Sequence, residues 1–224
     1  MGREFVTIFD EWVHTYDDSV SGKDAEYRDV FLRYEEILQA VADAATGPVI
    51  EFGVGTGNLT QKLIGRGLQV AGIEPNGAMR GVTQEKLKDV SIIDGDFLEF
   101  ETQLKPNSFV SSYAFHHLTD AEKADAFKLY AELLPAGGKV VFADTMFKSA
   151  EARNELVDFE KSRGHDNLVE DLNREYYTTL PIMKELIEQA GFTVEFTQLN
   201  NYVWLIDASK KSGNGRSSLD TKNY

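Results

Sequence analysis

Short, uninterrupted apolar runs alternate with helical segments from Pro48 onward, and this alternation constrains the fold more than any other feature of the chain. A strand without polar alternation is buried on both faces, which requires a parallel sheet covered by helices on each side. The expected strands are 48–52, 69–74, 90–94, 109–113 and 139–144, and the expected helices between them are 57–66, 77–87 and 120–134. The sequence therefore predicts an α/β, doubly wound fold.

The end of the chain breaks this rhythm. A helix is expected to begin at Pro181, because the first turn of a helix does not need the missing N–H. Two strands, 193–199 and 202–208, then follow, separated only by Asn200–Asn201, a pair that suits the positive φ angles of a tight hairpin. We therefore expect the sheet to end in an antiparallel strand. Residues 209–224 are polar and rich in Ser, Gly and Lys, and we expect them to be disordered.

Two amphipathic segments precede the alternating region. Apolar residues recur at helical spacing over Phe5–Tyr16 and again over Tyr27–Val41, so both segments are expected to be helices. Residues 1–46 would form a helical cap on a Rossmann-like core of residues 47–208. A chain of this length suits one domain, and we expect that domain to span residues 1–208.

Charge and cysteine content exclude several kinds of partner. The 224 residues carry 23 Lys and Arg against 37 Asp and Glu, a formal net charge of −14. Because a field of this sign repels polyphosphate and anionic lipid, we expect neither a nucleic acid nor a membrane as a partner, and a small molecule is favoured. The chain has no cysteine, no cationic and apolar leader and no apolar run of membrane-spanning length, so we expect a cytoplasmic protein. We expect a monomer or a homodimer.

The most informative stretch runs from Glu51 to Gly57, where an apolar strand enters a glycine-rich turn and then a helix. Gly53, Gly55 and Gly57 let the chain turn sharply and let a ligand approach the backbone beside a helix N-terminus. A dinucleotide fingerprint would need glycine at Asn58, so the spacing departs from that pattern. On its own the turn fits either a nucleotide-type ligand or a purely structural role.

Acidic residues follow the next two expected strands. Glu74 ends the second strand, where a carboxylate can accept hydrogen bonds from ribose hydroxyls. Asp96 follows the third strand and offers a carboxylate for an adenine amino group, although Asp94 could take this role instead. Met79 and Phe97 could line the adenine pocket or belong to the core. Three successive strand ends thus predict a nucleoside site.

These residues resemble a known family, the class I S-adenosylmethionine-dependent methyltransferases, and more narrowly its YrrT-like group of uncharacterised bacterial methyltransferases. Residues 51–57 are similar to the first motif of the family. Glu74–Pro75 resembles its ribose-binding strand end, and Asp96–Phe97 its adenine-binding turn. Residues 134–139 resemble its loop into the fifth strand, and the resemblance covers nearly the whole chain.

The resemblance implies a Rossmann-like sheet of seven strands whose last strand runs antiparallel, with N-terminal helices added and S-adenosylmethionine as the cofactor. The Gly53–Gly57 turn would hold the methionine part of the cofactor, with Glu51 also among the binding residues. Tyr16 would belong to a segment that folds over the cofactor, although it lies on the apolar stripe of its helix and core packing is the alternative. The activity implied is methyl transfer to a small-molecule acceptor by in-line displacement.

Two adjacent histidines, His116 and His117, follow the fourth strand, at the sheet edge where ligands collect in open sheets. Either could act as a general base or have only a structural role, and Asp144 is a further candidate base at the end of the fifth strand. We expect no metal site here, because adjacent side chains diverge and no third ligand has suitable spacing. Residues 145–180 are expected to shape the acceptor pocket, and the charges in this region hint at an anionic or zwitterionic acceptor.

Two other functions stay open at this point. A nicotinamide-dependent oxidoreductase would use Glu74 equally well, but the glycine spacing, the lack of a Tyr-x-x-x-Lys pair and the terminal hairpin disfavour it. A non-catalytic S-adenosylmethionine-binding protein would use the same glycines as an enzyme.

Overall fold

The structure, a computed structural model, describes residue 20 and residues 22–212 of the 224-residue chain. The expected first helix, including Tyr16, lies outside the described residues. So do residues 213–224 of the expected tail.

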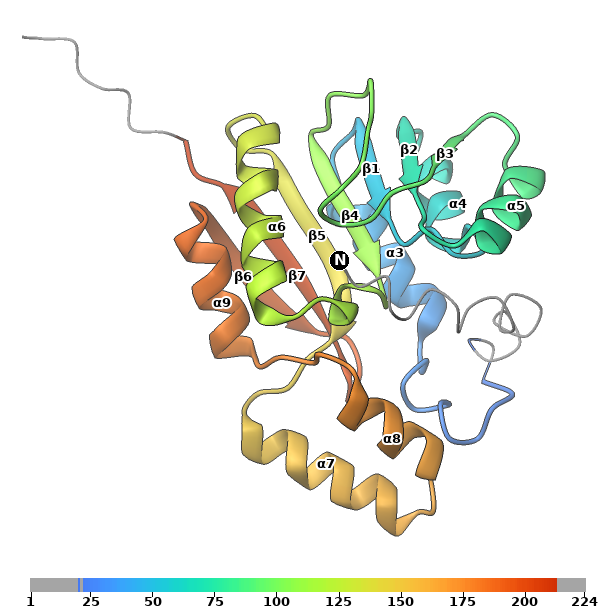
Figure 1. Cartoon of the computed structure of the whole chain (residues 1–224), viewed down its shortest axis with the longest axis vertical. Helices are drawn as coiled ribbons and strands as arrows, with labels where there is room; N and C mark the ends of the chain where they lie inside the picture. The colour runs from blue at the N-terminus through green and yellow to red at the C-terminus, as the bar shows by residue number, and fades with distance from the viewer. Residues whose placement is uncertain (1–19, 21, 213–224) are drawn as a thin grey trace, which may run out of the picture.

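Seven strands form one sheet. They are β1 (Val49–Phe52), β2 (Val70–Ile73), β3 (Ser91–Ile93), β4 (Ser108–Ser112), β5 (Lys139–Thr145), β6 (Phe192–Gln198) and β7 (Val203–Lys210). Their order is β3-β2-β1-β4-β5-β7-β6 (Figure 1). The strands from β3 to β5 in this order pair in parallel, whereas β7 is antiparallel to both β5 and β6. The predicted seven-stranded, doubly wound sheet is confirmed, and β7 extends past residue 208, where the tail was expected to begin.

Helices cover both faces of the sheet. They are α3 (Tyr34–Ala44), α4 (Asn58–Gly65), α5 (Gly77–Lys86), the 3-10 turn η2 (Phe115–His117), α6 (Asp120–Leu133), α7 (Ala150–Ser162), α8 (Asp166–Arg174) and α9 (Leu180–Gln189). On one face, α6 and α9 bury Tyr130 and Ile187 in a cluster with Phe109. On the other, Leu38 of α3 packs in a second cluster with Val141. Among the described residues, no helix has the length and apolar content needed to cross a bilayer.

The central strand β1 explains why this region was recognisable in the sequence. All four of its residues are buried, and Val49 and Ile50 are completely so. Complete burial of such a side chain contributes about 1.5–3 kcal/mol to folding. The acidic residue of this strand, Glu51, is therefore buried as well, and burying its carboxyl group lowers the stability of the fold unless the group has a partner.

The second expected helix is shorter than predicted. Residues 27–33 form turns, and α3 begins only at Tyr34. Arg33 has a φ of 66°, in the left-handed region, where a right-handed helix cannot continue. The apolar side chains of Tyr27, Val30 and Phe31 still pack against the sheet. Their spacing therefore predicted correctly that these side chains are buried, but the prediction that they lie on a helix is wrong.

The terminal hairpin forms, but not through the turn predicted. Arg33 and Tyr113 are the only non-glycine residues with positive φ in the described part of the chain, so the Asn200–Asn201 pair does not use that conformation. Instead, Oδ1 of Asn200 accepts hydrogen bonds from the backbone N of Tyr202 (2.8 Å) and Val203 (2.7 Å). The amide of Asn200 also donates to the carbonyls of Val30 and Leu32. One asparagine thus shapes the hairpin and ties it to the turns before α3.

Two helices within residues 145–180 were not predicted. In α7 the buried residue is Glu160, and α8 buries only Leu168 and Leu172, so neither helix has a broad apolar stripe. Figure 1 shows α7 and α8 packed together beyond the ends of the strands. They therefore add a layer next to the sheet edge where the predicted site residues lie.

Candidate functional site

The glycine-rich turn lies at the carboxyl end of β1, in the middle of the sheet. Gly53, Gly55 and Gly57 have φ angles of 65°, 56° and 83°. A Cβ on Gly53 would lie 2.8 Å from the Cβ of Ala114, whereas one on Gly55 would meet no described atom within 4 Å. Packing explains the glycine at position 53, and open space beside Gly55 lets a ligand approach the backbone.

Glu74 follows β2 directly and closes against this turn. Its Oε2 accepts a hydrogen bond from the backbone N of Gly55, and its Oε1 from that of Asn76, both at 2.8 Å. Strand pairing sets Ile73 opposite Phe52, so the two strand ends meet at one edge. Burial raises the pKa of Glu74, and the hydrogen bonds from Gly55 and Asn76 oppose this shift without cancelling it. The structure thus brings together two of the predicted site elements.

Glu51 is 1% exposed within β1. Burial raises the pKa of Glu51 to about 8, against the opposing effect of hydrogen bonding with Thr60. Among the described residues, its Oε2 has no hydrogen-bond partner although it is buried. Because an unpaired buried acceptor is costly, this oxygen suits a cationic or donating ligand group.

The residues after β3 have mostly internal partners. Oδ1 of Asp96 accepts hydrogen bonds from the backbone N of Leu98 (2.9 Å) and Glu99 (3.0 Å), which shapes the turn. The alternative residue, Asp94, is paired with Arg80 at 2.9 Å. Asp96 is therefore the buried acid of this pair and Asp94 the more exposed one.

Phe97 and Met79 are both buried. The Phe97 ring lies 5.1 Å from that of Phe52 and 5.2 Å from that of Phe115, within the main core cluster. Met79 is 2% exposed at the start of α5, where its backbone N donates to Asn76 Oδ1. Phe97 thus packs within the core cluster and Met79 is buried near the turn after β2, and their role in an adenine pocket stays a prediction.

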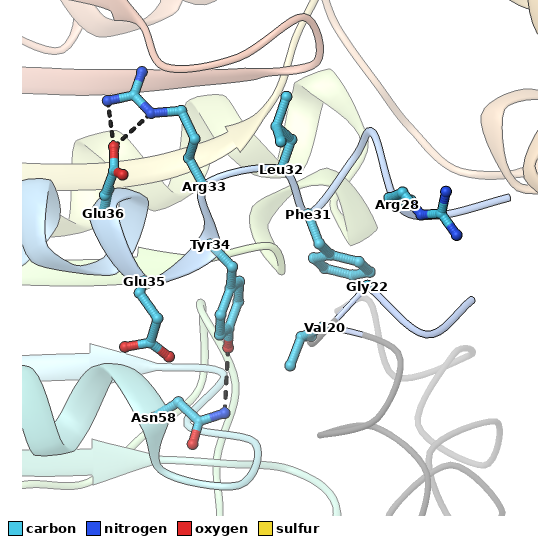
Figure 2. A pocket seen from close by; sticks show the side chains of 10 residues that line it. All are labelled: Val20, Gly22, Arg28, Phe31, Leu32, Arg33, Tyr34, Glu35, Glu36 and Asn58. Atoms are coloured by element: carbon cyan, nitrogen blue, oxygen red, sulfur yellow. Dashed lines mark hydrogen bonds and ion pairs between the residues drawn. The ribbon is translucent and has the colours of Figure 1, made fainter. Parts of the chain in front are cut away.

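A pocket of ≈ 640 Å³ borders the start of α4, next to the glycine turn (Figure 2). Its walls include Asn58, which directly follows Gly57, and Tyr34 at the start of α3. Figure 2 shows these two side chains pointing toward one another, with the amide of Asn58 donating to the Tyr34 hydroxyl at 3.4 Å. This volume falls within the range of small-molecule sites.

Strand order reverses between β1 and β4, and ligands of open α/β sheets bind in the crevice at such a switch point. Here that crevice contains a glycine turn, a strand-end carboxylate and a buried carboxyl with an unpaired oxygen. The fold is thus that of a doubly wound α/β protein, and its switch point brings together the glycine turn and the strand-end carboxylate of Glu74.

Comparisons with known proteins refine this class. Residues 49–138 match the family model described as a methyltransferase domain. An uncharacterized methyltransferase of Geobacillus sp. (strain WCH70) is 52% identical over 213 residues, covering 94% of this chain and all of the relative. One from Bacillus mycoides (strain KBAB4) is 51% identical over 212 residues, with the same coverage. The solved magnesium protoporphyrin IX methyltransferase of Synechocystis PCC 6803, with bound SAH, has a TM-score of 0.66 at 17% identity, covering 92% of this chain and 99% of that one.

The chain therefore belongs to the class I S-adenosylmethionine-dependent methyltransferases. It is a methyltransferase, and its cofactor is S-adenosylmethionine. Neither the oxidoreductase nor the non-catalytic binding protein finds support. The narrower resemblance to the YrrT-like group stays a prediction.

On the other half of the sheet edge, η2 places the two predicted histidines side by side, with ring centroids 4.3 Å apart. Nδ1 of His116 lies 2.6 Å from Oδ1 of Asp144, whose Oδ2 accepts from the His116 backbone N at 2.9 Å. Nε2 of His116 lies 3.3 Å from Oε2 of Glu175, and Nε2 of His117 lies 3.9 Å from Oε1. The expectation that these side chains diverge and lack a third partner is wrong, because the tight turn directs both rings toward Glu175.

The two histidines are not equivalent. Burial lowers the pKa of His116, but the carboxylates of Asp144 and Glu175 outweigh burial, so the pKa lies above its ordinary value. Burial and then the charge of His116 hold the pKa of His117 well below its ordinary value. One ring is thus held between two carboxylates, while its neighbour is kept neutral.

Long-range contacts hold Glu175 in place. The backbone N of Tyr176 donates to the carbonyl of His116 at 3.0 Å. The ammonium of Lys123, 1% exposed, donates to the carbonyls of Leu118 and Tyr176, both at 2.6 Å. Sequence reasoning missed both Lys123 and Glu175, because neither belongs to a motif and the contacts join segments that are far apart in the chain.

These residues border a cavity of ≈ 80 Å³ at the carboxyl edge of β4 and β5. It is lined by Tyr27, Val30, Phe31, Tyr113, His116, His117, Thr145, Leu168, Asp171, Leu172, Glu175, Tyr177 and Tyr202. The Tyr113 hydroxyl is buried without a hydrogen-bond partner among the described residues, and Tyr113 has a φ of 53°. A bulky residue in the left-handed region is strained, and such strain is frequent at functional sites.

The anionic or zwitterionic acceptor suggested by the charges of residues 145–180 stays a prediction. Arg153 donates to the Leu172 carbonyl at 2.6 Å, and Arg163 pairs with Asp29 at 2.6 Å. Neither arginine lines the cavity, whose charged walls include Asp171 and Glu175. The region does shape this cavity, through α8 and the residues that follow it.

Proposed function

We propose that the protein transfers a methyl group to a small molecule bound in the cavity lined by Tyr113, His116 and His117. The observation that carries this proposal is the contact between the two halves of the site. A Cβ on Gly53 would lie 2.8 Å from the Cβ of Ala114. Ala114 directly follows Tyr113, which lines the cavity. A donor held at the glycine turn and an acceptor in the cavity would thus be close neighbours.

The proposed cofactor contacts follow from the carboxyl ends of the first strands. Glu51 and the Gly53–Gly57 turn would hold the methionine part, since Glu51 offers an unpaired buried oxygen to its ammonium group. Glu74 would exchange its bond to the backbone of Gly55 for bonds from the ribose hydroxyls. Asp96 would contact the adenine amino group.

When bound, the cofactor supplies a methyl group on a positively charged sulfur, which is already activated for displacement. The protein must align the acceptor and exclude water. Burial raises the pKa of Tyr113 well above its ordinary value, so its hydroxyl keeps its proton and can donate a hydrogen bond to the acceptor. We assign this orienting role to Tyr113, and contact with the acceptor to His116 and His117.

The acceptor should be small and should not be anionic. A cavity of ≈ 80 Å³ holds only a small group of atoms, and carboxylates of Asp171 and Glu175 face it. The net charge of −14 disfavours nucleic acids as substrates. The absence of cysteine suits a reducing compartment, which supports the cytoplasm as the location, and monomer or homodimer stays a prediction.

A screen with S-adenosylmethionine labelled on its methyl group tests this function. Pools of neutral or cationic small molecules, total RNA and mixed proteins would each be incubated with the full chain. We expect label in a small-molecule pool, at a rate that needs the native protein. Label in RNA or protein alone would refute the proposed acceptor class.

The Tyr113→Phe variant tests the cavity. Losing a hydroxyl that bonds the acceptor should lower kcat/KM about tenfold, or ~1.4 kcal/mol, while the Kd for S-adenosylhomocysteine stays unchanged. Tyr176→Phe is the matched control, because Tyr176 is 38% exposed and does not line the cavity. Equal rates in the wild type and Tyr113→Phe would remove Tyr113 from the acceptor site.

A further inference from the structure

We propose that His116, His117 and Glu175 form a binding site for a divalent transition metal ion, with Zn²⁺ as the ion that the ligand set fits best. Two imidazoles and one carboxylate are a ligand set of catalytic zinc sites, in which further positions stay open. The inference goes beyond the proposed methyl transfer, and metal binding can be measured without any acceptor.

The distances fit a site that needs only a small inward movement. One ligand atom from each of the three residues lies within 4.8 Å of the other two. Zn–N and Zn–O bonds of about 2.1 Å at tetrahedral angles would set ligand atoms about 3.4 Å apart. The 3.3 Å between Nε2 of His116 and Oε2 of Glu175 is already at that spacing, and Nε2 of His117 lies 3.9 Å from Oε1, the other oxygen of the same carboxylate.

Both ends of the ligand set have supporting partners of the kind that metal sites use. His116 offers its Nδ1 to Asp144 at 2.6 Å, which turns its Nε2 toward Glu175. The Tyr177 hydroxyl donates to Oε2 of Glu175 at 2.6 Å. Carboxylate partners of a ligating histidine and hydrogen bonds to a ligating carboxylate orient the ligands and raise metal affinity.

Charge and lone pairs also favour a cation at this point. When Nδ1 of His116 donates to Asp144, Nε2 carries a lone pair that faces the Glu175 carboxylate at 3.3 Å. A metal ion between these atoms would satisfy both, and its two positive charges would balance the carboxylates of Asp144 and Glu175. A proton on Nε2 of His116 could instead bridge this nitrogen and Glu175. A single proton at that position would not also bond to Nε2 of His117, whereas a metal ion can bind all three residues.

The ligands are preorganised and face open space. The backbone bond from Tyr176 to His116 and the carbonyl contacts of Lys123 fix the two ligand-bearing segments relative to each other. The adjoining cavity of ≈ 80 Å³ has room for about two water molecules at ~30 Å³ each. An ion held by three protein ligands would therefore keep a position open toward the acceptor cavity.

Titration of the tag-free full chain with Zn²⁺, and with Co²⁺ as a coloured probe, tests the site after treatment with a chelator. We expect one ion per chain, with affinity falling at least about tenfold in both Glu175→Gln and His117→Asn. Glu170→Gln is the matched control, since Glu170 lies exposed on α8, five residues before Glu175 and outside the cluster, and it should bind like the wild type. Equal affinity in all four proteins, or no binding by the wild type, would overturn the proposal.

Three further measurements keep the result interpretable. The Kd for S-adenosylhomocysteine and the apo melting temperature, measured on the same samples, show whether each variant is folded and whether the cofactor site is intact. In the wild type, Zn²⁺ should shift the ring NMR signals of two of the four histidines in the chain. If no histidine signal moves, the ion is bound elsewhere and the assignment to this cluster is wrong, whatever the fate of the proposed methyl transfer.

Discussion

The two halves of the site are built in different ways. The cofactor side consists of β1, β2 and the turns after them. Its polar groups come from two consecutive strand–turn–helix units of the chain. The acceptor side consists of η2, the end of β5 and the segment after α8. There, His116 meets Asp144 and Glu175 only because distant segments pack together.

This difference explains what each half can tolerate. In the glycine turn of the cofactor side, backbone conformation and backbone N–H groups make the site, so a side chain added there acts mainly by filling space or distorting the turn. On the acceptor side, side chains hold one another, so removing one partner leaves another buried and unsatisfied. Substitutions on one side should therefore leave the other side unchanged.

The largest effect is expected from Gly55→Arg. A side chain at a φ of 56° is strained, and it would occupy the open space beside the turn, so affinity for S-adenosylhomocysteine should fall at least about a hundredfold, or ~2.8 kcal/mol. Gly67→Arg is the matched control, because Gly67 also has a positive φ and open space but lies before β2, away from the site. Calorimetry compares the two, and equal affinities would break the assignment of the cofactor side.

A smaller effect is expected from Lys123→Met, on the acceptor side. Loss of the ammonium leaves the carbonyls of Leu118 and Tyr176 without this donor, which should cost about 2 kcal/mol of unfolding free energy. Denaturant unfolding measures this cost, and S-adenosylhomocysteine affinity should not change. Lys128→Met, on the exposed part of the same helix, should stay within about 0.5 kcal/mol of the wild type. A large loss of cofactor affinity in Lys123→Met would show that the two sides are coupled.

For each pH unit, the smallest effect is a pH dependence that belongs to the cofactor side. Burial raises the pKa of Glu51 from 4.5 to about 8, so folding favours its protonated form. This contribution to stability is complete below pH 4.5 and is lost as pH rises through 8, by on the order of 1 kcal/mol per pH unit. Relative to Glu51→Gln, the apo wild type should therefore lose unfolding free energy between pH 5 and 8. Parallel pH profiles of the two proteins would exclude a buried, protonated Glu51.

Several elements could be predicted from the sequence because local chemistry fixed them. The strands around Glu51 and Glu74 follow from uninterrupted apolar runs, since only a doubly covered sheet buries such runs completely. Other elements could not. The helix expected from Tyr27 begins at Tyr34, since periodicity reports which side chains are buried and not the backbone that presents them.

By itself, the sequence determined the doubly wound sheet, its antiparallel end and the glycine turn with Glu74, because each depends on neighbours along the chain. Only the tertiary structure decided that Glu175 joins the two histidines, that Lys123 reaches the carbonyl of Tyr176 and that Asn200 ties the hairpin to Val30 and Leu32. The physical reason is that these contacts join residues distant in the chain, and long-range packing leaves no periodic signal in either segment.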